Sequence, residues 1–447
     1  MNLIDNLFSD LSFKSVSLDN MSEELFAMYV WQILNKKNKN ILLVTSNLIE
    51  ANKLFQKISL YTNDAYLFPM DDFLTSEAIA ISPDLLITRL ETLKAIQNDK
   101  PLIVITHLMG YLHFLPNKKI YKDNILTIST DMEISHKALI EKLQLLGYKR
   151  ETIVTKTGEL GVRGFIIDLF PLGESHPIRL EFFGDTVESI RTFDENTQRS
   201  LDHLNKVTIY PCTEFLVDTP LDKDEPTKPL DNYIKVDSIQ DYLTDSVTIY
   251  KDPSSIKTVY ENIVTDVKNY TEEKNIKTTR FFFPYKEKYQ EDAISYFYID
   301  SAIESKKEII SFNTKNPPQF YEDTESIEKY LSESLMHSKT IIISLKDYQK
   351  KSLMNKLNLP SIDTNLTNIE LGKINYISLE MEEGFIYKDY IFLTANELFQ
   401  KKTINKKYKT NFKYGSKITD INKLEIGDYV VHQSCGIGIY NGLKTLK

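Results

Sequence analysis

The chain has 447 residues, 42% of them hydrophobic and 26% charged, which fits a globular protein of three or four domains of roughly 100 to 150 residues each. Its net charge of -9 argues against a surface that wraps nucleic acid as a whole. No apolar run is long enough to span a membrane, no signal sequence is recognisable, and the two distant cysteines suggest neither disulfides nor a metal site. We therefore expect a cytoplasmic protein without membrane contact.

The first 128 residues alternate between helical and strand patterns. Apolar residues at helical spacing predict helices at 21–36, 48–61 and 82–96, and β-rich runs predict strands at 40–46 and 101–108. Such alternation favours a parallel, nucleotide-fold-like sheet. A phosphate loop would read G-x-x-x-x-G-K-[ST], and none of the fourteen glycines begins that pattern. We expect a sheet that does not hydrolyse nucleotides.

From about residue 129 the pattern becomes that of a compact antiparallel domain. A helix is predicted at 136–146. Short strands follow it, with turn residues between them. The predicted strands are 151–157, 162–170, 178–184, 186–193 and 207–211, and the predicted turns are 158–161, 172–176 and 184–185.

The remaining sequence is less regular. Residues 218–231 form a Pro- and Asp-rich connection, and 280–285 are predicted to be an aromatic strand. A second α/β alternation covers 314–400, with strands at 340–345, 374–379 and 389–394. Residues 400–447 carry ten lysines against three acids. This basic stretch could contact phosphates or an acidic partner, or be a solvated linker.

Candidate catalytic and metal-binding residues are not apparent. The seven histidines are scattered, and no zinc or metalloprotease spacing occurs. We predict structural roles for His107 and His113. The expectation is a chain with no catalytic, cofactor-binding or metal-binding residues.

Residues 147–211 contain, in order, the texts GYKR, VRGFIIDLFP, IRLEFFGD and DENTQR. This run resembles the second domain of the excision-repair protein UvrB and of the transcription-repair coupling factors (Mfd). FPMDDF at 68–73 and SPDLLITRLETL at 82–93 resemble the Mfd first domain. Residues 424–446 are similar to the start of the RNA-polymerase-interacting domain shared by Mfd and CarD-like regulators. UvrB keeps its phosphate loop and lacks this last module, so the resemblance favours the Mfd family.

The resemblance implies an α/β multidomain fold: a degenerate nucleotide-fold domain with an inserted antiparallel α+β domain, a small second α/β domain and the start of a small β-barrel. The expected limits are 1–128 for the first half of the degenerate domain, 129–212 for the inserted UvrA-binding domain, 213–313 for the remainder of the degenerate domain, 314–400 for the small α/β domain, 401–418 for a Lys-rich linker and 419–447 for the truncated polymerase module.

The resemblance also implies partners. In the family the inserted domain binds the damage-recognition ATPase UvrA through an exposed sheet face, and the matching positions here are Arg163, Arg179 and Phe183. Strand alternation independently places Arg179, Glu181 and Phe183 on one face. The alternative is that Phe183 belongs to the core and that the arginines pair with local acids, as we predict for Arg191 and Arg199.

The polymerase module is expected to pair by a strand edge with the RNA polymerase β subunit, and Leu446 matches a contact position. The family's motor domains, which use ATP and Mg²⁺ to translocate on DNA, would follow this module. We therefore expect this chain to be a non-catalytic docking portion that breaks off as the module begins. The alternatives are a degenerate UvrB-like ATPase or helicase and a CarD-like regulator without a repair function.

Overall fold

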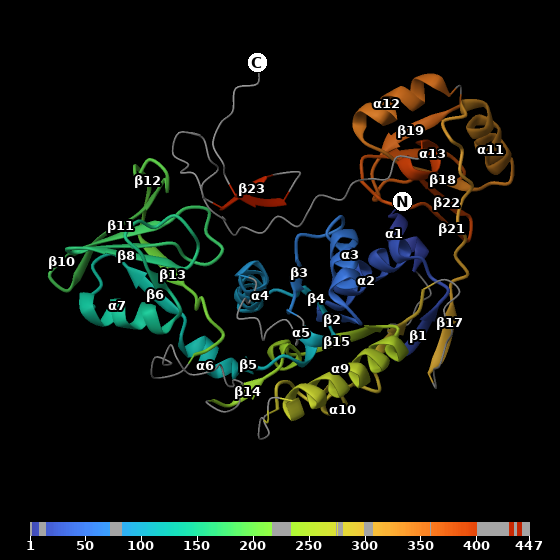
Figure 1. The fold of residues 1–447 in the computed structure, drawn as a ribbon. Helices are drawn as coiled ribbons and strands as arrows, with labels where there is room; N and C mark the ends of the chain where they lie inside the picture. Colours follow the sequence, from blue (N-terminus) through green and yellow to red (C-terminus); the bar gives the residue numbers. More distant parts are fainter. Residues whose placement is uncertain are drawn as a thin grey trace, which may run out of the picture. The chain divides into compact units, whose positions relative to one another are not determined.

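The computed structural model describes residues 2–8, 15–71, 83–216, 234–273, 275, 280–298, 307–357 and 359–399, together with the backbone of 429–432 and 436–439. The chain divides into two compact units. The first contains residues 1–126, 145–147 and 210–410, and the second contains 127–144, 148–209 and 411–447. Helices and several separate sheets give a mixed α/β architecture (Figure 1).

The first unit is built on a seven-stranded sheet in which every neighbouring pair is parallel. Chain segments before and after the second unit both contribute strands to this sheet. From edge to edge the strands are β17 (Glu308–Ser311), β1 (Val16–Asp19), β16 (Ile294–Tyr296), β15 (Ser246–Lys251), β2 (Asn40–Thr45), β4 (Ile103–His107) and β3 (Ala65–Phe68).

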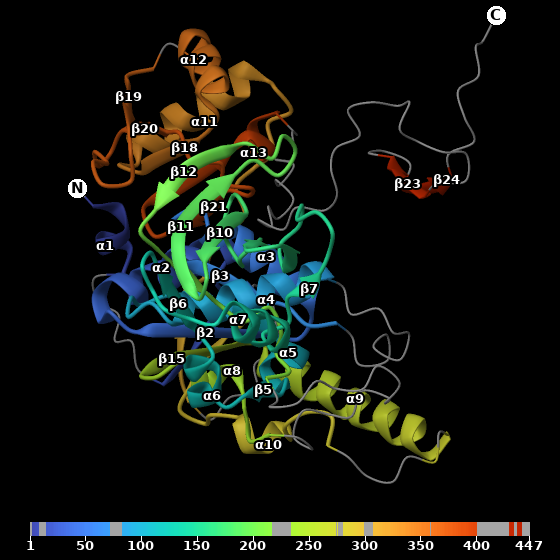
Figure 2. The same cartoon turned by 90° about the vertical axis from the view of Figure 1, so that its left-hand side faces the viewer.

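Nine helices of the described residues accompany this sheet: α1 (Leu3–Leu7), α2 (Glu23–Lys37), α3 (Leu48–Ile58), α4 (Pro83–Ile96), α5 (Leu108–Leu112), α6 (Lys118–Asp123), α8 (Ile239–Tyr242), α9 (Pro253–Glu273) and α10 (Tyr285–Lys288). The predicted helices at 21–36, 48–61 and 82–96 are confirmed, as are the strands at 40–46 and 101–108. Only Ile256 of α9 is buried, and this long helix projects from the sheet in Figure 2. A short antiparallel pair joins β5 (Leu115–Pro116) and β14 (Val236–Asp237).

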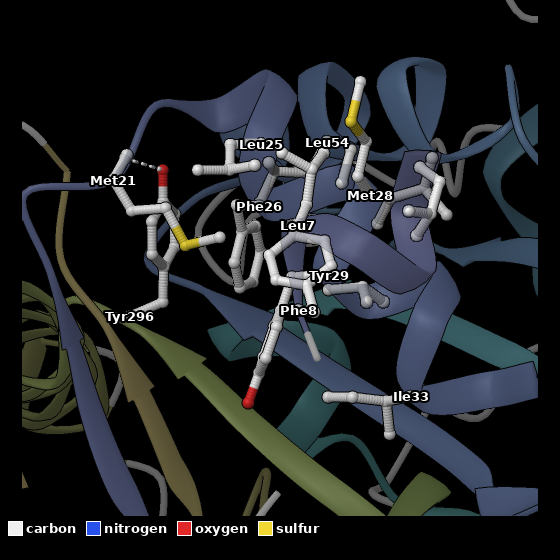
Figure 3. Close-up of a cluster of buried hydrophobic side chains, with 14 of the residues drawn as sticks. Leu7, Phe8, Met21, Leu25, Phe26, Met28, Tyr29, Ile33, Leu54 and Tyr296 are labelled. Carbon is white, nitrogen blue, oxygen red and sulfur yellow. Dashed lines mark hydrogen bonds between the residues drawn. The ribbon is translucent and has the colours of Figure 1, made fainter. Parts of the chain in front are cut away.

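The core of the first unit lies on both faces of the sheet. Ile41 and Leu43 of β2 belong to a buried cluster with the apolar residues of α1, α2 and α3, shown in part in Figure 3. There Phe26 stacks on Tyr296 with ring centroids 3.8 Å apart, and the Tyr296 hydroxyl donates to the Met21 carbonyl at 3.1 Å. Because strand residues alternate between faces, Leu42 and Val44 are buried on the opposite side.

A five-stranded sheet completes the first unit, in the order β19 (Ser361–Thr364), β20 (Ile374–Ile377), β18 (Thr340–Ser344), β22 (Tyr390–Thr394) and β21 (Phe385–Tyr387), with α11 (Thr324–Met336), α12 (Asp347–Lys356) and α13 (Ala395–Phe399). The strands predicted at 340–345, 374–379 and 389–394 are confirmed. Ile342, Phe385 and Phe392 of this sheet join the buried cluster of α1 and α2.

In the second unit, the described residues include a six-stranded sheet and the helix α7 (His136–Leu145). In order, the strands are β12 (Ser200–Leu204), β11 (Thr186–Phe193), β10 (Ile178–Phe183), β9 (Ile166–Leu169), β8 (Glu159–Arg163) and β7 (Lys149–Arg150). The described pairings are antiparallel except that of β7 with β8. Two further strands of the chain, β6 (Leu126–Ser129) and β13 (Lys206–Ile209), pair with each other.

Four local predictions are wrong. Residues 162–170 are two strands, because Gly164 adopts a φ of +59° and the chain reverses there. Residues 151–157 contain no strand, and the turn predicted at 158–161 is mostly the start of β8. The aromatic run 280–285 is not a strand either, since the Phe283 ring packs edge-on against Phe114 and Tyr285 begins α10.

Two further predictions concern the strands expected in residues 427–443 and the connection at 218–231. β23 (Tyr429–His432) and β24 (Gly436–Ile439) form an antiparallel pair, which accounts for the strands expected in this region. The connection at 218–231 lies outside the described residues.

Candidate functional site

The outward face of the second unit's sheet holds the three residues predicted to bind a partner there. Along β10, Ile178, Leu180 and Phe182 are buried while Arg179 and Glu181 are half-buried and Phe183 is exposed. The alternation expected from the sequence is therefore present, and the alternative in which Phe183 is a core residue is wrong. A bulge between Glu181 and Phe182 in the pairing with β11 shifts the register near the end of the strand.

Two tight turns bring aromatic side chains to one end of this sheet. Arg163 pairs with Ile166 across Gly164-Phe165, and Phe183 pairs with Thr186 across Gly184-Asp185. Each turn begins with a glycine at positive φ, +59° and +64°, which is the conformation that two-residue hairpin turns require. The Phe182 amide donates to the Phe165 carbonyl at 2.9 Å.

The two phenylalanines are far more exposed than apolar side chains of a folded domain usually are. Phe183 is 79% exposed and Phe165 is 64% exposed. The His136 ring of α7 lies beneath this end of the sheet, with its centroid 5.0 Å from the Phe182 ring and 6.2 Å from the Phe165 ring. Exposed aromatic residues beside arginines are the side chains that most often carry binding energy at interfaces.

Asp168 of β9 binds both predicted arginines. Its Oδ1 accepts from Arg179 Nε at 2.6 Å, and its Oδ2 accepts from Arg163 Nη2 at 2.6 Å and from Arg179 Nη2 at 2.9 Å. Strand pairing sets up this contact, because Arg179 lies directly opposite Asp168 in the ladder. Both arginines thus pair with a local acid, as the alternative interpretation supposed, yet both also lie on the outward face.

The two arginines differ in accessibility. The Arg163 side chain is 54% exposed and that of Arg179 only 12%. The Arg179 guanidinium also lies over the Phe193 ring, 4.5 Å from its centroid, and donates to Gln198 Oε1 at 3.3 Å. The hydrogen bonds to Asp168 raise the pKa of Arg179 further above its usual range.

The motif DENTQR at 194–199 has a structural explanation. The Asp194 carboxylate accepts from the Asn196 and Thr197 amides at 3.1 and 2.7 Å, and these bonds lower the pKa of Asp194. The resulting turn holds Gln198 at a φ of +59°, where its side chain meets Arg179. The motif therefore supports the arginine cluster from the adjoining loop.

Arg191 and Glu181 form a second ion pair on the same face. Glu181 Oε2 also accepts from the Ser189 hydroxyl at 2.8 Å. The structural ion pair predicted for Arg191 is confirmed. Arg199 is exposed and forms no ion pair with the described residues, so the prediction for Arg199 is wrong.

Sequence reasoning missed Asp168 and Phe165. The strand predicted to run through 162–170 concealed the turn at Gly164, which puts these residues beside Arg163 and Arg179. The glycine after Arg163 was the available signal, since a glycine inside a strand pattern often marks a bend. Leu446, predicted to contact RNA polymerase, lies outside the described residues.

The start of α2 is a second candidate site, because nucleotide folds bind phosphate at a helix N-terminus that follows a strand. Two acids occupy the first turn. Glu23 contacts Lys251 at 2.8 Å and Lys53 at 2.8 Å, and Glu24 contacts Lys57 at 2.6 Å. Burial disfavours the charge of Glu23, but Lys251 and Lys53 outweigh it and lower its pKa. The first turn of α2 therefore carries two acidic side chains, each paired with lysine.

The histidines have structural surroundings, as predicted. His107 is buried and its Nε2 lies 3.1 Å from both the backbone amide and the carbonyl of Met70. His113 Nε2 lies 3.1 Å from Glu214 Oε2, and Glu214 Oε1 accepts a hydrogen bond from Arg89 Nε at 2.7 Å. Among the described residues no cluster of three potential metal ligands occurs. Within the same residues, no helix is long and apolar enough to cross a membrane.

Comparison with protein families defines the class to which these features belong. Residues 126–215, which include the whole outward face described above, match the UvrB interaction domain. Residues 424–447 match the CarD-like/TRCF RID domain. Two separate segments of the chain therefore resemble these two domains.

Curated relatives are more specific. The chain is 27% identical to the transcription-repair-coupling factor of Staphylococcus epidermidis over 99% of its own length, and 25% identical to that of Staphylococcus haemolyticus over 99%. The transcription-repair-coupling factor of Staphylococcus aureus is 27% identical over 92% of the chain. The chain spans 44%, 43% and 40% of these relatives. The resemblance to transcription-repair-coupling factors inferred from the sequence is confirmed.

Proposed function

We propose that this chain acts in transcription-coupled nucleotide excision repair as a docking portion that recruits UvrA to RNA polymerase stalled at a DNA lesion. The observation that carries the proposal is the outward face of the second unit. It presents the half-exposed Arg163 and the exposed Phe183, with the exposed Phe165 in the adjoining turn, and it lies within the match to the UvrB interaction domain.

Arg163, Arg179 and Phe183 are the residues proposed to bind UvrA, with Phe165 added from the structure. Exposed apolar rings lose unfavourable contact with water on docking, and a guanidinium can donate two parallel hydrogen bonds to a carboxylate. The low exposure of Arg179 suggests that it supports the face more than it touches the partner.

RNA polymerase is the second proposed partner, through its β subunit. The supporting observations are the match at 424–447 and the β23–β24 pair within it. Addition of a strand edge supplies main-chain hydrogen bonds to such a contact, and Leu446 would supply an apolar side chain. A UvrB-like fold for the first unit and a small β-barrel for the polymerase module are part of the same proposal.

The chain itself is proposed to be non-catalytic, with ATP, Mg²⁺ and DNA translocation belonging to the motor domains of a longer family protein. Glu23 and Glu24 at the start of α2 support this proposal, because a phosphate placed there would meet two carboxylates. The same observation disfavours a degenerate UvrB-like ATPase. An ATP titration by equilibrium dialysis separates the two, since an ATPase would bind nucleotide stoichiometrically.

Titration calorimetry of the full 447-residue chain against UvrA tests the docking proposal. We expect saturable binding that weakens in Arg163→Ala. Lys206→Ala is the matched control, because Lys206 is an exposed cation of β13, outside the six-stranded sheet. Absence of binding by the folded wild-type chain would overturn the proposed function, and equal losses in both variants would show that the effect depends only on net charge.

A further inference from the structure

Asp168 is an outward-facing residue that solvent hardly reaches. It pairs with Arg179 across the β9–β10 ladder and with Gly161 across the β8–β9 ladder, so its side chain is directed to the same face as the arginines. It is nevertheless only 4% exposed. The arginine side chains cover it, and each of its carboxylate oxygens accepts at least one of their hydrogen bonds.

Gly161 lies opposite Asp168 and carries no side chain. A Cβ atom built at Gly161 would lie 3.1 Å from Val154 Cγ2, a tight contact, and 3.5 Å from Asp168 Cβ, an ordinary van der Waals contact. Local sequence, strand register and the turn at Gly164 together bring one acid between two arginines.

The two arginines differ in how they bind Asp168 and in how much of each side chain is exposed. Arg179 uses Nε and Nη2 on Asp168 and lies against Phe193, and its side chain is largely covered. Arg163 is bound to Asp168 through Nη2 and remains 54% exposed. A guanidinium has five N–H donors. Asp168 therefore fixes one edge of Arg163 while much of the group faces solvent.

Fixing an arginine before a partner arrives matters for affinity. A long side chain that is already ordered loses less conformational freedom when it binds. Two neighbouring guanidinium groups also repel each other unless an anion lies between them. A carboxylate that accepts from both removes the repulsion and restricts both side chains.

We propose that Asp168 is a positioning residue of the docking face, which holds Arg163 in the orientation that receives a carboxylate of the partner. The inference rests on the proposed docking of UvrA and names the chemistry that this part of the face recognises. Asp168 carries the same sign of charge as the group recognised, so its contribution is one of geometry and not of attraction.

Because Asp168 and the recognised carboxylate are both negative, attraction by charge and positioning predict opposite effects of removing the Asp168 charge. Replacing Asp168 by asparagine makes the face more positive. If the face worked through net charge alone, Asp168→Asn would bind UvrA more tightly, chiefly through faster association at low salt. If Asp168 positions Arg163, the variant binds about tenfold more weakly and dissociates faster.

A double-mutant cycle in the full chain, read by surface plasmon resonance with UvrA, decides between these outcomes. Asp168→Asn, Arg163→Ala and the double variant are compared with wild type. We expect Asp168→Asn to weaken binding in the wild-type background and to add almost nothing in the Arg163→Ala background. Asp202→Asn is the control, because Asp202 is an exposed carboxylate on β12 of the same sheet.

Urea unfolding of each variant shows under which conditions it is fully folded. Binding is compared only under conditions in which every variant is folded, so that weaker binding cannot be caused by unfolding. Additive effects of the two substitutions, or unchanged or tighter binding by Asp168→Asn, would overturn the inference while leaving the docking proposal intact. A wild-type chain that is folded and does not bind UvrA would overturn the docking proposal and this inference with it.

Discussion

Lys57 of α3 and Glu24 of α2 form an ion pair of 2.6 Å in which the two side chains are only 1% and 2% exposed. Glu382, from the segment before β21, lies 3.3 Å from the same ammonium group. Burial disfavours the charge of Lys57, but the two glutamates outweigh it and raise its pKa. Lys57 thus links helices beside the seven-stranded sheet to the segment before β21 of the five-stranded sheet, in addition to the hydrophobic cluster that the two sheets share.

Removing that cation should destabilise the first unit strongly. In Lys57→Met, Glu24 remains buried without a positive partner, and we expect a loss of about 3 to 5 kcal/mol in the free energy of unfolding at pH 7. Burial already raises the pKa of Glu24, and without the cation this carboxyl binds a proton more readily in the folded than in the unfolded chain, so the variant should regain stability as pH falls from 7 to 5. Urea unfolding at both pH values measures this.

Lys53→Met is the comparison for that prediction. Lys53 contacts Glu23 at 2.8 Å but is 44% exposed, and Glu23 keeps its contact with Lys251. We expect a loss below about 1 kcal/mol. Equal effects of the two substitutions would show that the buried pair has no special importance.

His107 should make the folded wild-type chain less stable as pH falls, the opposite of the effect expected for Lys57→Met. Burial lowers the pKa of His107 to about 4 from an ordinary value near 6.5. The unfolded chain then binds more protons than the folded one as pH falls below 6.5, so the folded state loses stability. The contribution between pH 7 and pH 5 is about 2 kcal/mol. His107→Gln should remove that part of the pH slope in urea unfolding, and an unchanged slope would contradict the assignment.

The two arginines of the docking face should separate in their effects on folding. The sequence predicts that Arg163→Ala and Arg179→Ala both weaken UvrA binding by roughly 1 to 3 kcal/mol without altering the fold. The structure adds a difference. Arg179→Ala removes two hydrogen bonds from a buried carboxylate and uncovers Phe193, so we expect it to destabilise the second unit by about 1 to 3 kcal/mol.

Arg163→Ala, by contrast, truncates a half-exposed side chain, and its unfolding free energy should change by less than about 1 kcal/mol. Urea unfolding and titration calorimetry on both variants provide the two readings. A stable Arg179→Ala variant that has lost affinity would mean that this arginine touches the partner directly.

Phe165 and Phe183 should matter for binding and not for folding. Both rings are largely exposed, so Phe165→Ala and Phe183→Ala should leave the unfolding free energy within about 0.5 kcal/mol of wild type. Each should reduce the affinity for UvrA by about 1 to 2 kcal/mol if the partner covers the ring. Met336→Ala, an 81% exposed residue of α11, is the matched apolar control, and calorimetry measures all three.

Periodicity predicted much of the fold, because it reports which side of an element is buried. The alternation of residues 178–183 appears in the structure as expected, and the helices before β2 and β4 lie close to their predicted limits. The errors arise where a tertiary contact outweighs local preference. Three consecutive phenylalanines at 281–283 have high strand propensity, yet Phe283 packs on Phe114.

The residues of the proposed docking face were predicted only in part for a related reason. Arg179 and Phe183 lie on one strand, so alternation alone places them together. Asp168 is placed next to them by strand pairing, which depends on a reversal at Gly164 that one glycine in an apolar run signals weakly. Nothing in the local sequence pairs Val16–Asp19 with strands almost 300 residues later.

The pairing of β1 with β16 and β17 affects the order in which the chain folds during its synthesis. Ser17 of β1 is the register partner of Ser295 of β16, and ribosomes add roughly 5 to 20 residues per second. The neighbours of β1 are therefore synthesised about 15 to 60 seconds after it, whereas the strands of the six-stranded sheet, between Lys149 and Leu204, are all synthesised within about 3 to 11 seconds. We predict that the inserted sheet is protease-resistant on nascent chains of about 260 residues while residues 16–45 are still cleaved; simultaneous protection of both regions would refute this order of folding.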